Sequence, residues 1–434
     1  MTAAKGEPVA MERDAESVTA GSEWLACIAC DQTYAVDDLR YACDCGALLS
    51  VERRASRYGL LSPEILQARA LSQKPLDVSG VWKYREVILT LDSKHVVTHP
   101  EGRTHLYFRQ SLADACGVED LRFKHEGENP TGSFKDRGMT VAVSRAKSMG
   151  LHSVACASTG NTSAALAAYA AHAGMRAVVL VPAGKIAVGK LAQAIGYGAT
   201  VIAVKGDFDA AMHLVQEAAK SLGLYLVNSL NPFRLEGQKT IILEMLEQLS
   251  GQEPDWVVVP AGNLGNTSAF GKALREAHTA GWIQRMPRIL SVQAAGANPF
   301  ATSFKSGLRE LHPIKAETIA TAIRIGDPVN WPKARRAITE TQGYVTDVSD
   351  DEIMTAKRAI DASGVGCEPA SAATMAGVKK MVSAGVIKTK ERVVCVLTGH
   401  MLKDPDAVLD SQAMAEIHTV EPTMKALERA LGNG

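Results

Sequence analysis

The stretch Trp256-Val-Val-Val-Pro-Ala-Gly-Asn-Leu-Gly-Asn-Thr-Ser268 joins an apolar run to a glycine-rich turn, and a helical pattern then continues to Glu276. This order is typical of a buried parallel strand and the connection that leaves it. The backbone N–H groups of such a turn, with the positive end of the following helix, favour a phosphate group. The spacing matches neither the three-glycine dinucleotide fingerprint nor a P-loop, and a tight turn without a ligand explains this segment alone equally well.

Short apolar runs followed by small-residue loops and helical patterns recur along the chain. They occupy 153–157, 177–181, 200–204, 225–227, 256–259, 289–292 and 393–397. Runs that are apolar on both faces and alternate with helices predict an α/β fold with buried parallel strands, and such folds bind ligands past the carboxyl ends of their strands. We therefore expect one composite small-molecule site where polar residues follow these runs, at 158–163, 228–231, 262–266 and 398–400.

Lys135 follows the turn Asn129-Pro-Thr-Gly132, and a helical pattern starts near Ser133. The lysine therefore falls in a first helical turn, where the helix dipole disfavours the charged amine and is expected to lower its pKa. A neutral amine is the nucleophile that bonds to a carbonyl carbon. A solvated lysine with a packed stem is the ordinary alternative, but the neighbouring polar loops favour the chemical role.

Charge and composition exclude several classes of protein. The 434 residues include 47 basic and 47 acidic side chains, and this balance gives no sign of a nucleic-acid or anionic-membrane partner. An apolar fraction of 46% and a charged fraction of 22% are ordinary for globular proteins. Residues 1–21 lack an apolar signal segment, so we expect a frayed leader and a cytoplasmic protein with reduced cysteines. The apolar stretch 164–183 contains His172 and Arg176, and it predicts a buried helix and strand instead of a membrane span.

Four of the eight cysteines cluster as Cys27-Ile-Ala-Cys30 and Cys43-Asp-Cys45. Two close cysteine pairs joined by a short loop suit a tetrahedral thiolate site, most often for structural zinc. Gly46 follows the second pair, where a knuckle needs a permissive backbone. A ribbon that keeps its shape by packing and binds no metal is the alternative, and occupancy stays open. The remaining cysteines are expected in the core: Cys116, Cys156, Cys367 and Cys395.

Five motifs, in order along the chain, resemble the motif set of the threonine synthases, within the tryptophan-synthase-β-like (fold type II) pyridoxal-phosphate enzymes. They are Asn129-Pro-Thr-Gly-Ser-Phe-Lys-Asp-Arg-Gly138, Ala157-Ser-Thr-Gly-Asn-Thr-Ser163, Pro260-Ala-Gly-Asn-Leu-Gly-Asn266, Cys367-Glu-Pro-Ala-Ser371 and Val396-Leu-Thr-Gly-His400. The resemblance runs from about Trp82 to Asp406. The segments 228–239 and 321–326 favour the threonine synthases over the other enzymes of this superfamily. Cys367 departs from the valine-like residue expected at its position.

The resemblance implies a fold type II architecture: two parallel-sheet α/β domains with the cofactor between them, preceded by a zinc-ribbon-like leader. We expect the leader over residues 1–76, a large domain formed by 77–126 and 227–434, and a small domain over 127–226. The resemblance also implies a homodimer that acts on a small-molecule substrate, with no nucleic-acid or membrane partner.

The resemblance implies that Lys135 bonds covalently to pyridoxal phosphate and moves protons, in a carbon–oxygen lyase that converts O-phospho-L-homoserine and water to L-threonine and phosphate. Asn161 would bond the phenolic oxygen of the cofactor ring, and Thr398 would meet the pyridine nitrogen. The cofactor phosphate would lie on Gly262, Asn263, Leu264, Gly265 and Asn266. The substrate side would be formed by Ser158, Thr159, Thr162, Ser229 and Arg234, with Lys239 as a weaker candidate or a surface charge.

Three alternatives remain open. Cysteate synthase, the serine/threonine dehydratases and cysteine synthase share the lysine and the glycine loop, although Arg234 favours a phosphorylated substrate. A non-catalytic protein that keeps the fold would lack the chromophore of the bound cofactor. The segment Glu368-Pro-Ala-Ser371 either supports the far edge of the ring or caps a helix.

Overall fold

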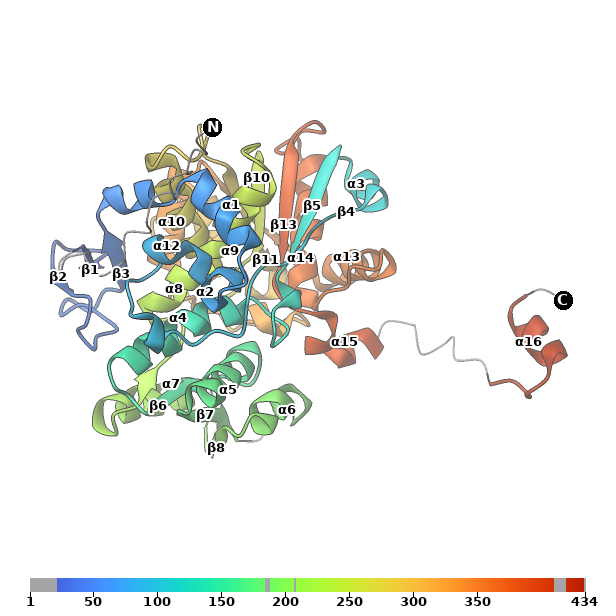
Figure 1. Ribbon diagram of the computed structural model, residues 1–434. Helices are drawn as coiled ribbons and strands as arrows, with labels where there is room; N and C mark the ends of the chain where they lie inside the picture. Colours follow the sequence, from blue (N-terminus) through green and yellow to red (C-terminus); the bar gives the residue numbers. More distant parts are fainter. Residues whose placement is uncertain (1–21, 184–187, 207, 410–418, 433–434) are drawn as a thin grey trace, which may run out of the picture.

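The computed structural model of the protein describes residues 22–183, 188–206, 208–409 and 419–432 (Figure 1). The expected frayed leader over 1–21 lies outside these residues. The described strands form three separate β-sheets, and helices surround the two larger ones. None of the described helices is long and apolar enough to cross a membrane.

The large sheet contains six strands in the order β12-β11-β10-β13-β5-β4. All neighbouring pairs are parallel except β4 and β5. Residues of β10 are completely buried, as expected for a central strand covered on both faces. The strands are β4 (Leu106–Phe108), β5 (Asp120–His125), β10 (Trp256–Pro260), β11 (Arg288–Ala294), β12 (Tyr344–Val348) and β13 (Arg392–Leu397).

The small sheet contains four parallel strands in the order β8-β7-β6-β9. They are β6 (Ser153–Ala157), β7 (Arg176–Pro182), β8 (Thr200–Val204) and β9 (Tyr225–Leu226). All seven apolar runs predicted as strands form parallel strands, which confirms this part of the prediction. The expected burial does not hold for β8, because it lies at the edge of the small sheet and several of its residues are exposed. The strands of the small sheet fall within 127–226, whereas the domain limits themselves stay a prediction.

Three strands of the large sheet, β4, β5 and β12, were not expected, and β5 and β12 carry charged residues. In β5, Lys124 is completely buried, and its ammonium lies 2.6 Å from a carboxylate oxygen of Glu244. This pair makes a lysine compatible with a core strand. Periodicity of apolar residues cannot reveal a buried ion pair whose partner lies more than a hundred residues away.

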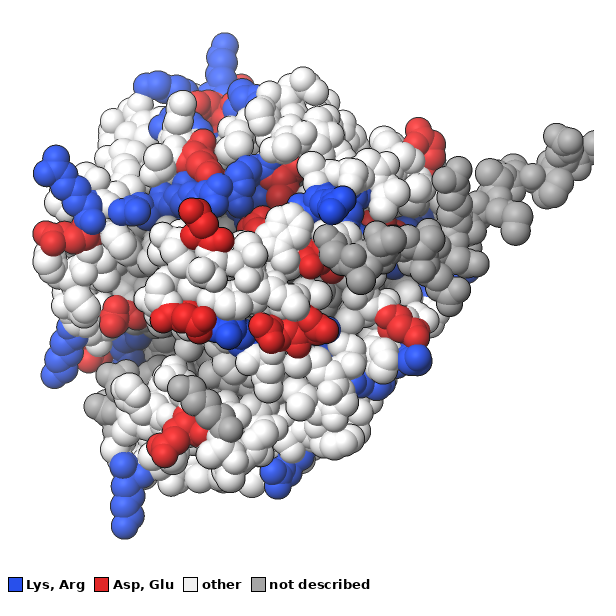
Figure 2. All heavy atoms as spheres, turned by 90° about the vertical axis from the view of Figure 1, so that its left-hand side faces the viewer, with Lys and Arg blue, Asp and Glu red and all other residues white. Residues whose placement is uncertain are grey.

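The N-terminal ribbon is a three-stranded antiparallel sheet in the order β2-β1-β3. Its strands are β1 (Glu23–Cys27), β2 (Thr33–Ala35) and β3 (Leu49–Arg53), which fits the expected zinc-ribbon-like shape. The segment after β3 packs against the ribbon, since Tyr58, Leu61 and Val81 are buried in one cluster with it. On the face that carries the ribbon, both signs of charge lie side by side (Figure 2).

The α-helices in chain order are α1 (Pro63–Leu71), α2 (Pro75–Val78), α3 (Gln110–Cys116), α4 (Lys135–Ser148), α5 (Asn161–Ala173), α6 (Val188–Gly196), α7 (Phe208–Ser221), α8 (Pro232–Gln238), α9 (Thr240–Gln248), α10 (Gly265–Thr279), α11 (Pro299–Lys305), α12 (Trp331–Glu340), α13 (Asp350–Ala362), α14 (Pro369–Ser383), α15 (Pro405–Leu409) and α16 (Met424–Ala430). The 3₁₀ turns are η2 (Ala55–Leu60), η3 (Trp82–Val87), η4 (Ser93–His95), η5 (Glu126–Glu128), η6 (Ala295–Ala297), η7 (Thr321–Ile323) and η8 (Met401–Lys403). As expected, 164–183 divides into the end of α5 and β7.

Helices α4 and α8 approach each other at a pair of glycines. A Cβ atom on Gly237 would lie 1.7 Å from the backbone oxygen of Arg137, and one on Gly138 would lie 3.0 Å from the backbone oxygen of Arg234. Only glycine permits such a close approach of two backbones. The side chain of Arg137 is completely buried and pairs with Glu126 at 2.7 Å and Glu244 at 2.9 Å, which fixes α4 in place.

We predict that Gly237→Ala destabilises the protein by about 1–3 kcal/mol or more, because the added methyl group must push the two helices apart. Gly196→Ala is the matched control, since a Cβ atom there meets open space at the end of α6. The control should be neutral or slightly stabilising. Urea unfolding of both variants measures the difference, and equal free energies of unfolding would contradict the close crossing.

Candidate active site

Lys135 is the first residue of α4, two residues later than the sequence pattern indicated. The preceding residues are fixed to the end of β13: the N–H of Phe134 donates to the carbonyl oxygen of Thr398 at 3.0 Å, and Ser133 bridges to Gly399. The start of α4 therefore lies at the carboxyl edge of the large sheet, where parallel α/β folds bind their ligands.

The pKa of Lys135 is lowered to about 7, and burial of the amine is the largest cause. The positive charge of Arg234 lowers it further, and the carboxylate of Glu368 acts in the opposite direction. The predicted direction is therefore confirmed, but burial replaces the helix dipole as the main reason. The amine lies 3.9 Å from the ring centroid of Phe134, and no described carboxylate is close enough to form an ion pair with it.

Arg234 lies on α8 with only 4% of its surface exposed. Its Nη1 donates to the carbonyl oxygen of Val227 at 3.0 Å, while its Nε has no hydrogen-bond partner among the described residues. Burial lowers the pKa of this guanidinium to about 10. A buried cation without a carboxylate partner in the described chain is costly, and an anionic ligand would offset that cost.

The glycine-rich turn leads directly into α10, which begins at Gly265. Leu264 occupies the N-cap position with φ 63°, and its apolar side chain makes no capping hydrogen bond. The first backbone N–H groups of α10 therefore lack a side-chain partner and can receive an anion. Gly262 packs closely on η7, because a Cβ atom there would lie 3.0 Å from the Cα of Ile323.

Side chains of three loops meet beside this turn. Asn263 donates from Nδ2 to the Oγ of Ser229 at 2.6 Å, and its Oδ1 accepts from the N–H of Val329 at 2.8 Å. Asn330 donates to the carbonyl oxygen of Ser229 at 3.3 Å. Asn266 is buried, and its Oδ1 has no partner among the described residues. The structure thus brings Ser229 to the predicted phosphate turn, and it adds Asn330, which the sequence analysis did not single out.

A second set of side chains connects α5, α14 and the end of β13. The hydroxyls of Thr398 and Ser371 lie 2.9 Å apart, and Ser371 also accepts from the N–H of Thr398 at 2.8 Å. Glu368 accepts from Thr398 at 3.3 Å and from the amide of Asn161 at 3.0 Å. Burial raises the pKa of Glu368. Glu368 occupies the N-cap position of α14, but its side chain makes no capping hydrogen bond there and bonds Thr398 and Asn161 instead.

The remaining predicted substrate residues lie where α5 starts: Ser158 and Thr159 in the turn before it, and Thr162 in its first turn. Ser158, Thr159 and Thr162 are each partly exposed. The Oγ of Ser158 accepts from the N–H of Gly160 at 3.2 Å, and Gly160 occupies the N-cap position of α5 without a side-chain cap. This second uncapped helix start offers N–H groups to a carboxylate.

Lys239 is neither a surface charge nor a site residue. It is completely buried, and its ammonium lies 2.7 Å from Glu236 and 2.8 Å from Glu276. Both carboxylates satisfy the lysine, so it has no free charge for a substrate phosphate. Sequence position alone could not distinguish it from Arg234, which lies five residues earlier on α8.

The donor set fits pyridoxal phosphate. The uncapped start of α10 suits its phosphate, the half-buried amine of Lys135 with a pKa of about 7 suits its aldehyde, and the hydroxyl of Thr398 suits its ring nitrogen. The side-chain amide of Asn161 is a donor for the phenolic oxygen. These individual roles stay predictions.

Comparison with known proteins agrees with this donor set. The profile of the family described as "Pyridoxal-phosphate dependent enzyme" matches residues 97–399. The threonine synthase of Methanocaldococcus jannaschii is 48% identical over 408 residues, which cover 93% of this chain and 98% of that relative. The threonine synthase of Methanosarcina acetivorans is 45% identical over 410 residues, which cover 94% of this chain and 98% of that relative.

Solved structures show the same fold. The crystal structure of threonine synthase from Escherichia coli matches with a TM-score of 0.67 over 94% of both chains, at 18% sequence identity. Maize serine racemase matches with a TM-score of 0.61 over 73% of this chain and 94% of its own, at 23% identity. At these identities the structural likeness supports the fold, and the family rests on the profile and the sequence relatives. The chain therefore belongs to the pyridoxal-phosphate-dependent enzymes and, within them, to the threonine synthases.

Proposed function

We propose that the protein converts O-phospho-L-homoserine and water to L-threonine and phosphate. The two relatives described above are named threonine synthases, and this chain matches 98% of the length of each. The observation in this chain that carries the proposal is the buried Arg234, which no described carboxylate neutralises and which is near enough to Lys135 to lower its pKa.

The phosphate of the substrate is a suitable partner for Arg234. A guanidinium binds phosphate oxygens with two parallel hydrogen bonds, and the bond strengthens when the site excludes water. The cofactor has a phosphate of its own, for which the start of α10 is the better match. The proposal therefore gives the two anionic groups separate places, one at Arg234 on α8 and one on the glycine turn, where Asn263 donates to Ser229.

Lys135 is suited to proton transfer. When bound, pyridoxal phosphate supplies an electron sink that stabilises negative charge on a substrate carbon. A lysine with a pKa of about 7 takes up and releases a proton readily at neutral pH. Its position beside Glu368 and Arg234 lets it act on the substrate carbons between the cofactor and the phosphate.

Thr398 and Glu368 form a hydrogen-bonded group at the end of β13. Thr398 is hydrogen-bonded to both Ser371 and Glu368, so its hydroxyl orientation is fixed. A neutral hydroxyl binds a ring nitrogen without forcing it to accept a proton. Glu368 orients Asn161 through the 3.0 Å hydrogen bond between them.

The proposal includes a homodimer in the cytoplasm. All eight cysteines are free thiols, which fits a reducing compartment, and the family resemblance supports two copies. Analytical ultracentrifugation should give the mass of two chains.

We predict that Lys135→Ala loses the visible absorbance of the covalently bound cofactor and at least about 100-fold in activity, because the amine provides both attachment and proton transfer. Lys147→Ala, in the last turn of the same helix, is the matched control. Absorbance spectra and phosphate release from O-phospho-L-homoserine measure both effects. Retention of the colour and of turnover in Lys135→Ala would refute the assignment.

We predict that Arg234→Gln lowers kcat/KM for O-phospho-L-homoserine roughly 30-fold to several thousandfold, while the cofactor absorbance remains. This factor corresponds to a loss of about 2–5 kcal/mol of transition-state stabilisation. Arg275→Gln is the control, since that arginine lies near the end of α10 and pairs with Glu340 of α12. Unchanged kcat/KM in Arg234→Gln would contradict the phosphate site. No turnover of this substrate by the unsubstituted enzyme, together with activity on phosphoserine and sulfite, would instead identify a cysteate synthase.

We also predict that covalent attachment of pyridoxal phosphate to the apoprotein accelerates as pH rises through about 7, because only the deprotonated amine of Lys135 reacts. Arg234→Gln removes a positive charge that lowers this pKa, so the midpoint should move to higher pH. Stopped-flow absorbance at a series of pH values measures the midpoint. An unchanged or lower midpoint in the variant would show that Arg234 does not act on Lys135.

A further inference from the structure

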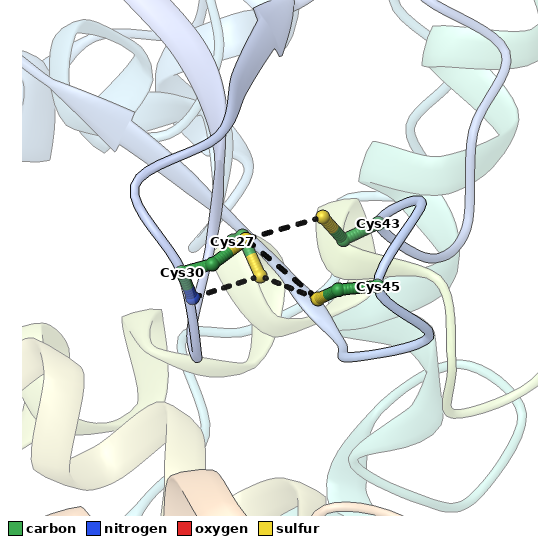
Figure 3. A group of neighbouring side chains, drawn as sticks. All are labelled: Cys27, Cys30, Cys43 and Cys45. Atoms are coloured by element: carbon green, nitrogen blue, oxygen red, sulfur yellow. Dashed lines mark hydrogen bonds between the residues drawn. The ribbon is translucent and has the colours of Figure 1, made fainter.

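The four N-terminal cysteines converge on one point of the ribbon. Cys27 ends β1, Cys30 lies on the loop that follows it, and Cys43 and Cys45 lie on the loop before β3. Their sulfur atoms point toward one another (Figure 3). All four Sγ atoms lie within 4.8 Å of one another. The separations are 3.6 Å for Cys27–Cys45, 3.6 Å for Cys30–Cys43 and 3.7 Å for Cys30–Cys45.

These separations match the geometry of a tetrahedral metal site. Four sulfur atoms at about 2.3 Å from a zinc ion lie about 3.8 Å from one another. A disulfide needs about 2.05 Å between its two sulfur atoms, and none of the three possible pairings of these four cysteines is formed, because all four are free thiols. The sulfur atoms are thus spaced as ligands around a common centre.

Hydrogen-bond donors surround the sulfur atoms. The backbone N–H groups of Ala29 and Cys30 each donate to the Sγ of Cys27 at 3.4 Å. The hydroxyl of Tyr34 lies 3.1 Å from the Sγ of Cys43. Such donors stabilise thiolates that bind a metal. The second loop can turn back on itself because Gly46 adopts φ 86°.

We propose that Cys27, Cys30, Cys43 and Cys45 bind one Zn²⁺ ion, and that this metal holds the ribbon loop against the part of the molecule that carries Lys135. Four protein ligands close the coordination sphere and leave no position for a substrate or water. The metal therefore has a structural role, which is the role for which proteins use closed four-thiolate zinc sites.

The loop between the two cysteine pairs contacts the small sheet and α4. Tyr41 precedes Cys43 by two residues, and its hydroxyl accepts from the N–H of Leu226 in β9 at 2.7 Å. The carbonyl oxygen of Val36 accepts from Arg145 of α4 at 2.9 Å. Because α4 begins with Lys135 and β9 leads into the loop with Ser229, the ribbon loop touches both segments that supply site residues.

The other side of the ribbon contacts α8 and α12. Arg53 of β3 pairs with Glu236 of α8 at 2.5 Å, and Lys333 donates to the carbonyl oxygen of Leu49 at 2.6 Å. The ribbon is thus fixed to the helix of Arg234 on one side and to β9 on the other. The sheet of the ribbon has only three short strands and a small core. A bound metal therefore adds the stability that keeps the loops with the cysteines in place.

The metal content of the full chain tests the ligand set. We expect inductively coupled plasma mass spectrometry to find one zinc per chain in protein purified under reducing conditions, and none in Cys45→Ala. That position is exposed, so the substitution leaves the core intact. Cys116→Ala, which removes a cysteine outside the cluster, should keep its zinc. Replacement by Co²⁺ should give the visible absorption bands of a tetrahedral thiolate site in the control and not in Cys45→Ala.

Absence of zinc from the unsubstituted protein, even after incubation with Zn²⁺ and a reductant, would overturn the proposal. Stoichiometric iron would also overturn it, as would full zinc retention in Cys45→Ala.

Hydrogen–deuterium exchange tests the role of the metal independently of activity. In Cys45→Ala, peptides that cover β9 and the start of the following loop should exchange faster than in Cys116→Ala, because the N–H of Leu226 loses its fixed partner on Tyr41. Peptides from α13, which is remote from the ribbon in Figure 1, should exchange equally in both variants. Equal exchange at β9 in the two variants would show that the metal does not hold this contact.

Discussion

The close backbone contact between α4 and α8 determines where chemistry can occur in this molecule. Gly138 and Gly237 remove the side chains that would keep the helices apart, and the buried ion pairs of Arg137 fix the orientation of α4. Lys135 stands at the start of one helix, and Arg234 lies on the other. Two cations are therefore held near each other in a dry environment, an arrangement that packing alone would not favour.

This pair of cations explains the properties of the site. Burial and mutual repulsion favour the neutral amine on Lys135, which is the reactive form, while the guanidinium of Arg234 remains charged. Both proposed ligands, the cofactor and the substrate, bring phosphate groups that offset this positive charge. The uncapped start of α10 and the unpaired Nε of Arg234 offer two places for them.

Much of the fold follows from local sequence, and much of the site follows from it as well. The apolar runs form parallel strands, which place their carboxyl ends at one edge of each sheet. The polar loops after β6 and β9 of the small sheet meet those after β10 and β13 of the large sheet, through the hydrogen bonds of Asn161 with Glu368, which also bonds Thr398, and of Ser229 with Asn263. The sequence pattern could not predict β5, since the burial of Lys124 depends on the distant Glu244. The pattern also could not distinguish Lys239, which pairs with Glu236, from Arg234, which no described carboxylate neutralises. Nor could it predict that the side chain of Glu368 bonds Asn161, because this contact forms only when α5 and α14 come together in the fold.

The most direct test of the account is a crystal structure of the cofactor-bound protein with a phosphonate analogue of O-phospho-L-homoserine. The account predicts that the phosphonate oxygens accept hydrogen bonds from the guanidinium of Arg234, that the cofactor phosphate lies at the start of α10, and that the cofactor lies against the Nζ of Lys135. A phosphonate bound elsewhere, with Arg234 turned toward a carboxylate of the protein, would contradict it.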